Sequence, residues 1–460
     1  FTFLTHYAET ADSVFEDISN FYSNRAHARA AKVHEALDAL MPAELHPLSL
    51  SQKAVHLVRS ASGVTTVLVV LAGWEVIKER VSQYMAAFLI LSGLMNGVFC
   101  ALDLVFFYLF FEAGLIPMFL IIGIWGGKRR IYASFKFFLY TFVGSLLMLV
   151  GILYVFLHTP DQSFSLNSFY AANIGTTEQY VLFWLFFIAF AIKMPIFPFH
   201  TWQPDAYDQA PAAVTMVLSG VMVKMGVFAV MRWLLPLFPD AVKHFDKVVI
   251  GLSVTGMVYA SIIAMRQDNL KRLVAYSSIA HIGLMCAALF ALNTNSMQGV
   301  MLQMFNHGVN IIGLWIVVDL IERQTGVRRI SELGGIAQKA PVLTVLLVVI
   351  ALANVALPLT NAFVGEFLMF SGLYHFSPLF AAVAGLSIIL SAVYTLNMIR
   401  NVFYGDTNAL TAQVKEPAMD ERIILAVIVV LIFMVGVHPG PLFDLVQQST
   451  EFILTRTGGK

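Results

Sequence analysis

Long apolar stretches recur along this 460-residue sequence, and they constrain its fold more than any other feature. A helix that crosses the roughly 30 Å hydrocarbon core of a bilayer needs about 20 mostly apolar residues. Such stretches recur between residues 62 and 442 with short connections. Apolar residues make up 58% of the chain and charged residues 12%, against roughly 25% charged in soluble domains. The sequence therefore predicts an all-α polytopic membrane protein of about a dozen helices in one domain.

The same pattern divides the chain into regions. Residues 1–59 are rich in His, Asp, Glu and Ala, so we expect an atypical, extramembrane N-terminal segment with an amphipathic surface helix. Residues 60–442 are expected to form a transmembrane domain of about twelve spans, and residues 443–460 a C-terminal tail. The chain begins with Phe1 and lacks an initiator methionine, so we expect that an upstream piece is missing.

Charge placement is more informative than net charge. Lysine plus arginine (28) balance aspartate plus glutamate (28), which indicates no nucleic-acid partner. Cytoplasmic connections of membrane proteins are enriched in Lys and Arg. Alternate connections here are basic, as at Lys78, Arg272 and Lys415, whereas residues 158–179 hold neither Lys nor Arg. We expect the basic connections to face the cytoplasm or the matrix, and residues 1–59 to lie on the opposite side.

Several ionisable residues lie inside the apolar stretches. Each costs about 2.5 to 3.5 kcal/mol at mid-span on insertion scales, so a retained one is a functional candidate. Burial disfavours the charged form of a lysine and a neighbouring carboxylate favours it, so moving one partner changes the protonation of the other. Chains of such groups are typical of proton relays in pumps. The candidates are Glu112, Lys193, Lys224, His281, His307 and Glu366.

Structural roles remain open for these residues. Glu112 and Lys193 could form an ion pair with no functional role. The two histidines could simply form hydrogen bonds to a neighbouring helix. Glu366 could cap the end of a helix. Asp103 immediately precedes an apolar stretch and is interpreted as an N-cap. Arg232 lies near the end of a stretch and is expected to extend its charged group to water.

Two apolar stretches contain helix-breaking residues. The segment "FAIKMPIFPFH" carries Pro195 and Pro198, and Pro358 interrupts a stretch in the other half. Proline removes a backbone hydrogen bond and clashes with the preceding turn. Unwound backbone at membrane depth is tolerated only where it is buried in protein or lines a wet cavity. Matched interruptions in two halves indicate an inverted-repeat transporter, and each has a titratable residue nearby, Lys193 at the first and Glu366 at the second.

Motifs for redox or nucleotide chemistry are missing from the sequence. It has no G-x-G-x-x-G, no Walker loop, no cysteine cluster and no histidines paired as haem ligands. We therefore expect neither a cofactor nor a metal ion in this chain.

Five segments carry a resemblance to a known family: "LFFEAGLIPMFLIIGIWGG", "FAIKMPIFPFHTWQPDAYDQAP", "LKRLVAYSSIAHIG", "MFNHG" and "NAFVGEF". They resemble the M-subunit family of respiratory complex I, called NuoM in bacteria and NADH dehydrogenase subunit 4 in mitochondria. The resemblance runs over residues 64–440. It implies an antiporter-like fold with two inverted repeats of five helices and two discontinuous helices.

The resemblance also implies a function. Members of this family are proton-translocating membrane-arm subunits of NADH:quinone oxidoreductase, a translocase whose redox chemistry takes place in other subunits. No redox centre is expected in this chain, because FMN, the iron–sulfur clusters and quinone belong elsewhere in the complex. The implied partners are other membrane subunits, including L-type and N-type antiporter-like neighbours, together with the lipid bilayer and protons. The implied location is a bacterial inner membrane or the mitochondrial inner membrane, as a multi-pass protein.

The resemblance assigns a role to each buried charge. A neighbouring subunit is expected to separate Glu112 from Lys193, which favours release of a proton from the lysine. The proton then passes through a central lysine and two connecting histidines to a terminal glutamate, which releases it opposite the basic connections. In chain order the matching residues are Glu112, Lys193, Lys224, His281, His307 and Glu366.

The chain departs from the family in two places. The usual "LPDAH" is "QPDAY" here, so Tyr207 replaces a histidine that cannot be obligatory. Residues 1–59 stand where the family has two further N-terminal spans; truncation, an uncertain sequence and divergence all remain open. The alternative functions are the D subunit of a multisubunit sodium/proton antiporter, a membrane subunit of a membrane-bound hydrogenase, a solute symporter and a purely structural scaffold.

Overall fold

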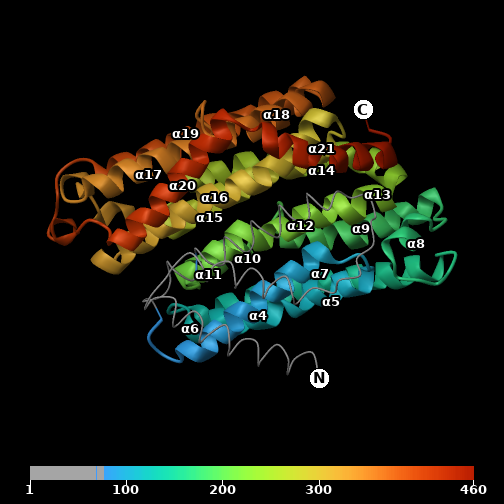
Figure 1. The fold of residues 1–460 in the computed structure, drawn as a ribbon, viewed down its shortest axis with the longest axis horizontal. Coiled ribbons are helices and arrows are strands. Elements are labelled where there is room, and N and C mark those ends of the chain that lie inside the picture. Colours follow the sequence, from blue (N-terminus) through green and yellow to red (C-terminus); the bar gives the residue numbers. More distant parts are fainter. Residues whose placement is uncertain (1–68, 70–76, 460) are drawn as a thin grey trace.

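A computed structural model describes residue 69 and residues 77–459 of the chain. The expectations for residues 1–59 lie outside these residues. In the described part, helices run along the long axis in two groups, with α4–α13 on one side and α14–α21 on the other (Figure 1).

The first group of helices leads from the N-terminal side to the middle of the chain. It comprises α4 (Val81–Cys100), α5 (Leu104–Ala113), α6 (Leu115–Trp125), α7 (Arg130–Leu157), α8 (Leu166–Tyr170), α9 (Thr176–Lys193), α10 (Trp202–Gln209), α11 (Ala212–Val217), the π-helical turn η1 (Leu218–Met222), α12 (Val223–Ala229), the π-helical turn η2 (Val230–Leu234) and α13 (Leu235–Leu237).

The second group continues to the C-terminus. It comprises α14 (Pro239–Met265), α15 (Leu270–Phe290), α16 (Thr294–Thr325), the 3₁₀ turns η3 (Ile330–Glu332) and η4 (Ile336–Gln338), α17 (Pro341–Asn354), α18 (Asn361–Phe376), α19 (Pro378–Phe403), the 3₁₀ turn η5 (Thr411–Gln413), α20 (Met419–Val437) and α21 (Gly440–Thr457). The last helix overlaps the region expected to be a C-terminal tail.

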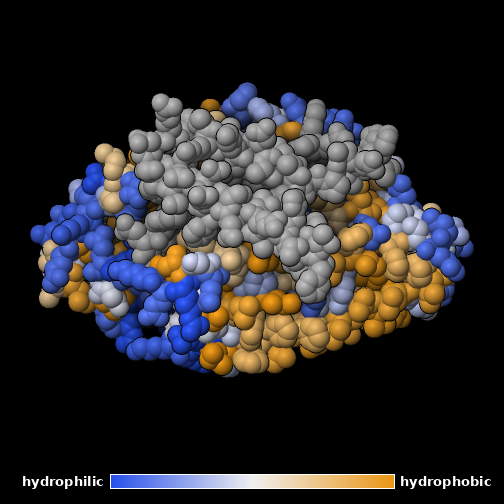
Figure 2. Space-filling view, turned by 60° about the horizontal axis from the view of Figure 1, so that its bottom comes forward, coloured by the Kyte–Doolittle hydropathy of each residue, from blue (hydrophilic) through white to orange (hydrophobic). Residues whose placement is uncertain are grey.

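Membrane-spanning helices dominate the described residues. By length and composition, eight helical segments there can cross a bilayer, or up to nine if the bent pair α20–α21 forms one crossing. The outer faces of α4–α7 and of α17–α20 carry exposed apolar side chains, as expected for surfaces that face lipid. Figure 2 shows apolar residues across the middle of the molecule and hydrophilic ones toward both ends. The chain is a multi-pass membrane protein.

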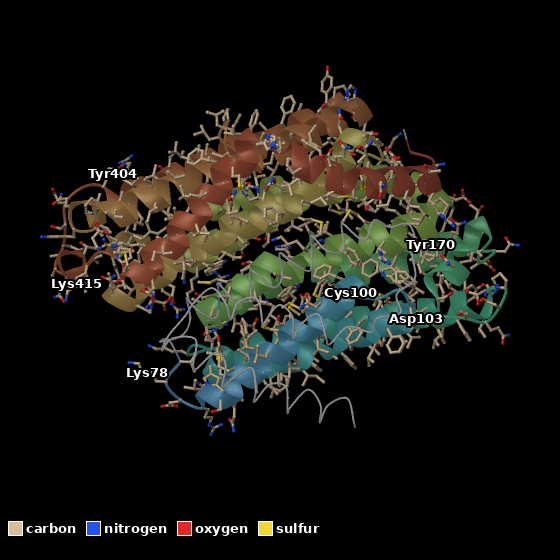
Figure 3. All side chains as sticks on the ribbon, viewed as in Figure 1. Lys78, Cys100, Asp103, Tyr170, Tyr404 and Lys415 are labelled. Atoms are coloured by element: carbon tan, nitrogen blue, oxygen red, sulfur yellow. The ribbon has the colours of Figure 1, made fainter. Side chains whose placement is uncertain are left out.

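The basic connections gather at one end of the bundle. The Gly127 amide donates to the Gln209 carbonyl at 2.8 Å, and Arg328 donates to the Asp208 carbonyl at 2.9 Å. Lys78 and Lys415 lie at this end, whereas Asp103 and Tyr170 lie at the other (Figure 3). The alternation of basic connections therefore corresponds to two separate ends of the molecule.

Asp103 caps α5 as the sequence predicts. Its carboxylate accepts hydrogen bonds from the backbone amides of Val105 (2.9 Å) and Phe106 (3.1 Å). These two amides have no partner inside the helix, so the cap fixes where this crossing begins.

Both predicted helix interruptions are present. The first separates α9 from α10 at residues 194–201, and the second separates α17 from α18 at residues 355–360. The Trp202 indole donates to the Ile192 carbonyl at 2.9 Å, which satisfies one of the acceptors left at the end of α9. At the second interruption, Ala356 and Leu359 have positive φ angles of 56° and 74°, a conformation that costs about 1 to 2 kcal/mol per non-glycine residue.

Each interruption packs against a glycine of a neighbouring helix. A Cβ atom added at Gly226 of α12 would lie 2.9 Å from the Met194 backbone nitrogen in the first interruption. A Cβ atom added at Gly436 of α20 would lie within 3.0 Å of backbone atoms of Leu359 and Thr360 in the second. Close backbone approach therefore holds both unwound segments in place.

Candidate functional site

Glu112 occupies the last turn of α5, just before the turn at Gly114 that separates α5 from α6. Pro117 has no backbone N–H to bond the Ala113 carbonyl, which explains why α5 ends at Ala113 and α6 begins at Leu115. The Glu112 side chain is half-buried, and its Oε2 atom has no hydrogen-bond partner among the described residues. The carboxylate therefore lies between the interior and the outer surface of this chain.

Lys193 is the last residue of α9, at the first interruption. Its side chain is 1% exposed, and within the described part its Nζ atom has no hydrogen-bond partner. The amine lies over the ring of Phe111, 4.6 Å from the centroid. No ion pair within 4.0 Å joins Lys193 to Glu112 in the described structure. Lys193 therefore contacts the residue that precedes Glu112 in the chain, and the charge pair expected from the sequence stays a prediction.

Lys224 and His307 are in direct contact. The Lys224 Nζ atom donates to the Ser219 carbonyl within the π-helical turn η1 and lies 2.7 Å from the His307 Nδ1 atom of α16. Both side chains are buried. π-Helical turns are rare and frequently occur at functional sites, because they re-register the helix locally. This turn was not predictable from residue types alone.

His281 and Glu366 continue this line of contacts. The rings of His307 and His281 have centroids 5.5 Å apart, and their Nε2 atoms have no hydrogen-bond partner among the described residues. The His281 Nδ1 atom lies 3.0 Å from Glu366 Oε1 on α18, just beyond the second interruption. The structure therefore brings Lys224, His307, His281 and Glu366 into one buried row.

Further polar groups around Glu366 were missed at the level of sequence. The Gln303 side chain donates a hydrogen bond to Glu366 Oε1 at 3.2 Å. Gln303 lies four residues before His307, a spacing that places both side chains on the same face of a helix, so the sequence could have indicated this residue. Tyr394 donates to the Ser277 hydroxyl at 2.9 Å beside the same row. No sequence pattern distinguishes this tyrosine from the other aromatic residues of α19.

The departures from the family motif lie in the interior. Both polar atoms of the Gln203 amide and the Tyr207 hydroxyl are buried without a hydrogen-bond partner in the described part. The Tyr207 ring contacts the edge of Trp315 at 5.9 Å. His200 is also buried, and it packs against Phe197 and Tyr259.

The expectation for Arg232 was wrong. Its side chain is only 2% exposed, so the guanidinium does not reach water beyond the span. The sequence placed Arg232 near the end of an apolar stretch, but Tyr170 of α8 packs over it and donates its hydroxyl to the Arg232 carbonyl at 2.7 Å. Helix α8, which is distant in sequence, covers Arg232. A local hydropathy pattern cannot show such a contact.

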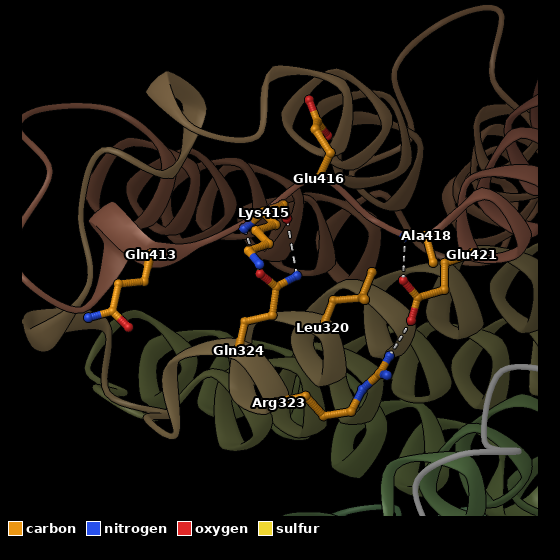
Figure 4. A pocket seen from close by; sticks show the side chains of 8 residues that line it. All are labelled: Leu320, Arg323, Gln324, Gln413, Lys415, Glu416, Ala418 and Glu421. Atoms are coloured by element: carbon orange, nitrogen blue, oxygen red, sulfur yellow. Dashed lines mark hydrogen bonds and ion pairs between the residues drawn. The ribbon is translucent and has the colours of Figure 1, made fainter.

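An open pocket of about 360 Å³ lies at the basic end, far from the row. Its charged lining is largely paired: Arg323 contacts Asp319 at 2.8 Å and Glu421 at 2.6 Å. The Gln324 side chain binds both backbone polar atoms of Lys415 (Figure 4). These contacts join the end of α16 to the loop before α20, which is a structural role.

In the described residues, no three or more His, Cys, Asp or Glu side chains are grouped so that they could hold a metal ion. The clustered ionisable groups are a lysine, two histidines and a glutamate. Such groups can bind and release protons, so the row has the chemistry that proton transfer requires.

Comparisons with known proteins agree with this geometry. The family model described as "NADH:quinone oxidoreductase/Mrp antiporter, TM" matches residues 101–391. NADH-quinone oxidoreductase subunit M of Rhodobacter capsulatus is 42% identical over 399 residues, 84% of this chain and 78% of that protein. NADH-ubiquinone oxidoreductase chain 4 of Prototheca wickerhamii is 36% identical over 396 residues, 85% of this chain and 75% of that protein.

Solved structures show the same fold. A chain of respiratory complex I from Thermus thermophilus has a TM-score of 0.83 at 31% identity, covering 88% of this chain and 85% of that chain. A chain of the Mrp complex from Dietzia sp. has a TM-score of 0.81 at 16% identity, covering 100% of this chain and 97% of that chain, which supports the fold alone.

Interrupted helices beside a buried row of titratable groups define an antiporter-like membrane subunit. The sequence matches cover most of the chain at identities that establish common ancestry. The chain belongs to the NADH:quinone oxidoreductase/Mrp antiporter family, with relatives named as subunit M or chain 4. The antiporter-like fold expected from the sequence is confirmed.

Proposed function

We propose that this chain is the proton-translocating M subunit of a membrane-bound NADH:quinone oxidoreductase. Redox chemistry in other subunits supplies the energy, and this chain moves protons across the membrane. The observation that carries the proposal is the buried row from Lys224 to Glu366, in a chain whose relatives are named as subunits of this oxidoreductase.

The second-half row supports stepwise proton transfer. His307 Nδ1 takes a proton from Lys224 across 2.7 Å, and His281 Nδ1 gives one to Glu366 across 3.0 Å. Each imidazole accepts at one nitrogen and donates from the other. The proton must also pass from His307 Nε2 to His281 Nε2, two atoms that have no hydrogen-bond partner among the described residues. One bridging water or a ring rotation completes this step.

Glu112 and Lys193 act as the switch of this path. When a neighbouring subunit moves the Glu112 carboxylate toward Lys193, the ammonium form is stabilised; when they separate, burial favours the neutral amine. The half-buried position of Glu112 suits a group that responds to a neighbour. Proton release from Lys193 then loads Lys224 and the row beyond it.

The assembly follows from the same proposal. The partners are other membrane-arm subunits, including L-type and N-type antiporter-like neighbours, and the surrounding bilayer. FMN, iron–sulfur clusters and quinone are held elsewhere in the complex, and the membrane is a bacterial inner membrane or the mitochondrial inner membrane. Glu366 releases its proton on the side opposite the basic connections.

Replacing Lys193 or Glu112 by alanine in the assembled complex tests this function. Removal of either group leaves the other without its charge partner, so both variants are expected to abolish redox-driven proton pumping in reconstituted vesicles. Lys339→Ala is the matched control, because Lys339 is an exposed lysine at the basic end. If both alanine variants assemble normally and pump protons at the wild-type rate, the proposal is wrong.

The same preparation distinguishes the nearest alternative. A subunit of a multisubunit sodium/proton antiporter exchanges sodium for protons without NADH or quinone. NADH-driven proton uptake by the purified complex supports the oxidoreductase. Sodium-dependent proton exchange without NADH oxidation supports the antiporter.

A further inference from the structure

The Phe111 ring lies beneath the buried amine of Lys193. The Lys193 amine is 4.6 Å from the Phe111 ring centroid, although a carboxylate is available on the next residue, Glu112. The amine has no hydrogen-bond partner among the described residues. An aromatic face is therefore the contact that this buried amine makes in the structure.

The ring contact is chemically suited to an ammonium group. The face of an aromatic ring carries partial negative charge and attracts a cation that lies within about 6 Å of the ring centroid, most strongly when the pair is desolvated. Phe111 and Lys193 are each only 1% exposed, so water does not weaken the interaction. Unlike a carboxylate, the ring cannot accept the proton.

The Phe111 ring is held in a fixed place. Phe107 lies one helical turn away with its ring centroid 5.5 Å from that of Phe111, and Phe190 packs edge-on against it at 6.3 Å. Phe190 lies three residues before Lys193 on α9, so the same packing aligns the helix that carries the amine. Because its packing is fixed, the ring can serve as a defined binding position for the Lys193 amine.

We propose that Phe111 is a positioning residue that holds the charged Lys193 amine at a second station, so that the amine alternates between the Glu112 carboxylate and the Phe111 ring. The inference rests on the proposed function. The ring holds the ammonium group in a defined orientation after it leaves Glu112 and before it releases its proton. The flexible four-carbon stem of lysine makes this movement without a change in backbone.

Fluorinated phenylalanine analogues at position 111 of the assembled complex test the inference. Successive fluorine atoms withdraw electron density from the ring face with little change in size. Redox-driven proton pumping is expected to fall stepwise from mono- to di- to trifluorophenylalanine, by about two- to fivefold over the series, as expected for a weakened cation–π contact. Pumping that stays at the wild-type rate throughout the series overturns the inference.

The same series at Phe107 is the matched control. Phe107 belongs to the same buried aromatic cluster, and its described ring contacts are to Phe111, Phe190 and Trp233, with no amine over the ring. A flat response there, with a graded one at Phe111, assigns the effect to Lys193. An equal fall at both positions assigns it to packing and overturns the inference.

Lys193→Ala separates the two proposals. If that variant pumps normally, the proposed function fails together with the inference. If it stops pumping while the Phe111 series is flat, only the positioning role of Phe111 fails.

Discussion

Lys224 and His307 bring two proton-binding nitrogen atoms within 2.7 Å of each other in the interior. One of the two must donate and the other accept, so they share a proton rather than each holding one along this line. The Ser219 carbonyl binds the same amine, which keeps the lysine directed toward the histidine. At the residue scale, Lys224 and His307 form a short contact between two groups that can each act as an acid and as a base.

The Lys224→Arg substitution keeps the positive charge at this position but removes the ability of the side chain to release a proton. Arginine is not deprotonated in proteins, so a guanidinium at position 224 blocks the path although it can still bind His307. We expect proton pumping to fall at least about tenfold, and Lys243→Arg, an exposed control, to leave it unchanged. Pumping at the wild-type rate by the Lys224→Arg complex is inconsistent with a proton leaving this amine.

At the element scale, the two interruptions position the charged groups. Pro195, Pro198 and Pro358 allowed both breaks to be predicted, because proline cannot continue the helical ladder. The glycines that clamp the breaks were not predictable, since their partners are distant in sequence. The same limit applies to the π-helical turn before Lys224, which depends on how α16 packs against η1.

Gly436→Ala is expected to displace the second interruption. The new methyl group would lie within 3.0 Å of backbone atoms of Leu359 and Thr360, and backbone cannot rotate away as a side chain can. We expect a loss of roughly 1 to 3 kcal/mol of stability, seen as a lower midpoint of thermal inactivation of the complex, together with reduced pumping.

Gly385→Ala is the matched control for this substitution. Gly385 lies in α19 with no atom within 4 Å of an added Cβ atom, so alanine there is expected to be neutral or to stabilise the helix by up to about 1 kcal/mol. If the two alanine variants are equally stable, close packing at Gly436 does not hold the interruption.

Asp205→Asn is expected to loosen α10, the helix after the first interruption. The Asp205 carboxylate binds Lys136 at 2.7 Å and Arg272 at 3.0 Å, so it ties α10 to α7 and α15. An amide leaves two cations close together without an anion, at a cost of roughly 1.5 to 3 kcal/mol. Thermal inactivation measures the loss, and Asp406→Asn in an exposed loop is the control. Identical inactivation curves for the two variants contradict the anchoring role.

At the scale of the whole molecule, the distribution of charge gives the chain two distinct ends. Hydropathy and basic connections predicted the membrane class and this polarity, because both are local properties of the chain. Whether Lys193 contacts a carboxylate or a ring depends on how α5 packs beside α9, which no local pattern contains. The buried Arg232 illustrates the same limit, since α8 covers it from another part of the sequence.

Because the two ends of the molecule face opposite sides of the membrane, cysteines placed at the two ends are expected to be labelled from opposite sides. With both native cysteines replaced, Lys415→Cys is expected to react with an impermeant thiol reagent from the cytoplasmic or matrix side, and Lys243→Cys from the other side. Oriented membrane vesicles provide the measurement. Reaction of both positions from one side contradicts the assigned polarity.

The number of protons pumped per NADH oxidised by a complex with Glu366→Gln tests the central claim most directly. Glutamine can keep a hydrogen bond to His281 but cannot release a proton, so the last step of the row is blocked while redox chemistry elsewhere is not. We predict a lower proton-to-NADH ratio than in the wild-type complex at equal assembly. An unchanged ratio would contradict proton release through Glu366.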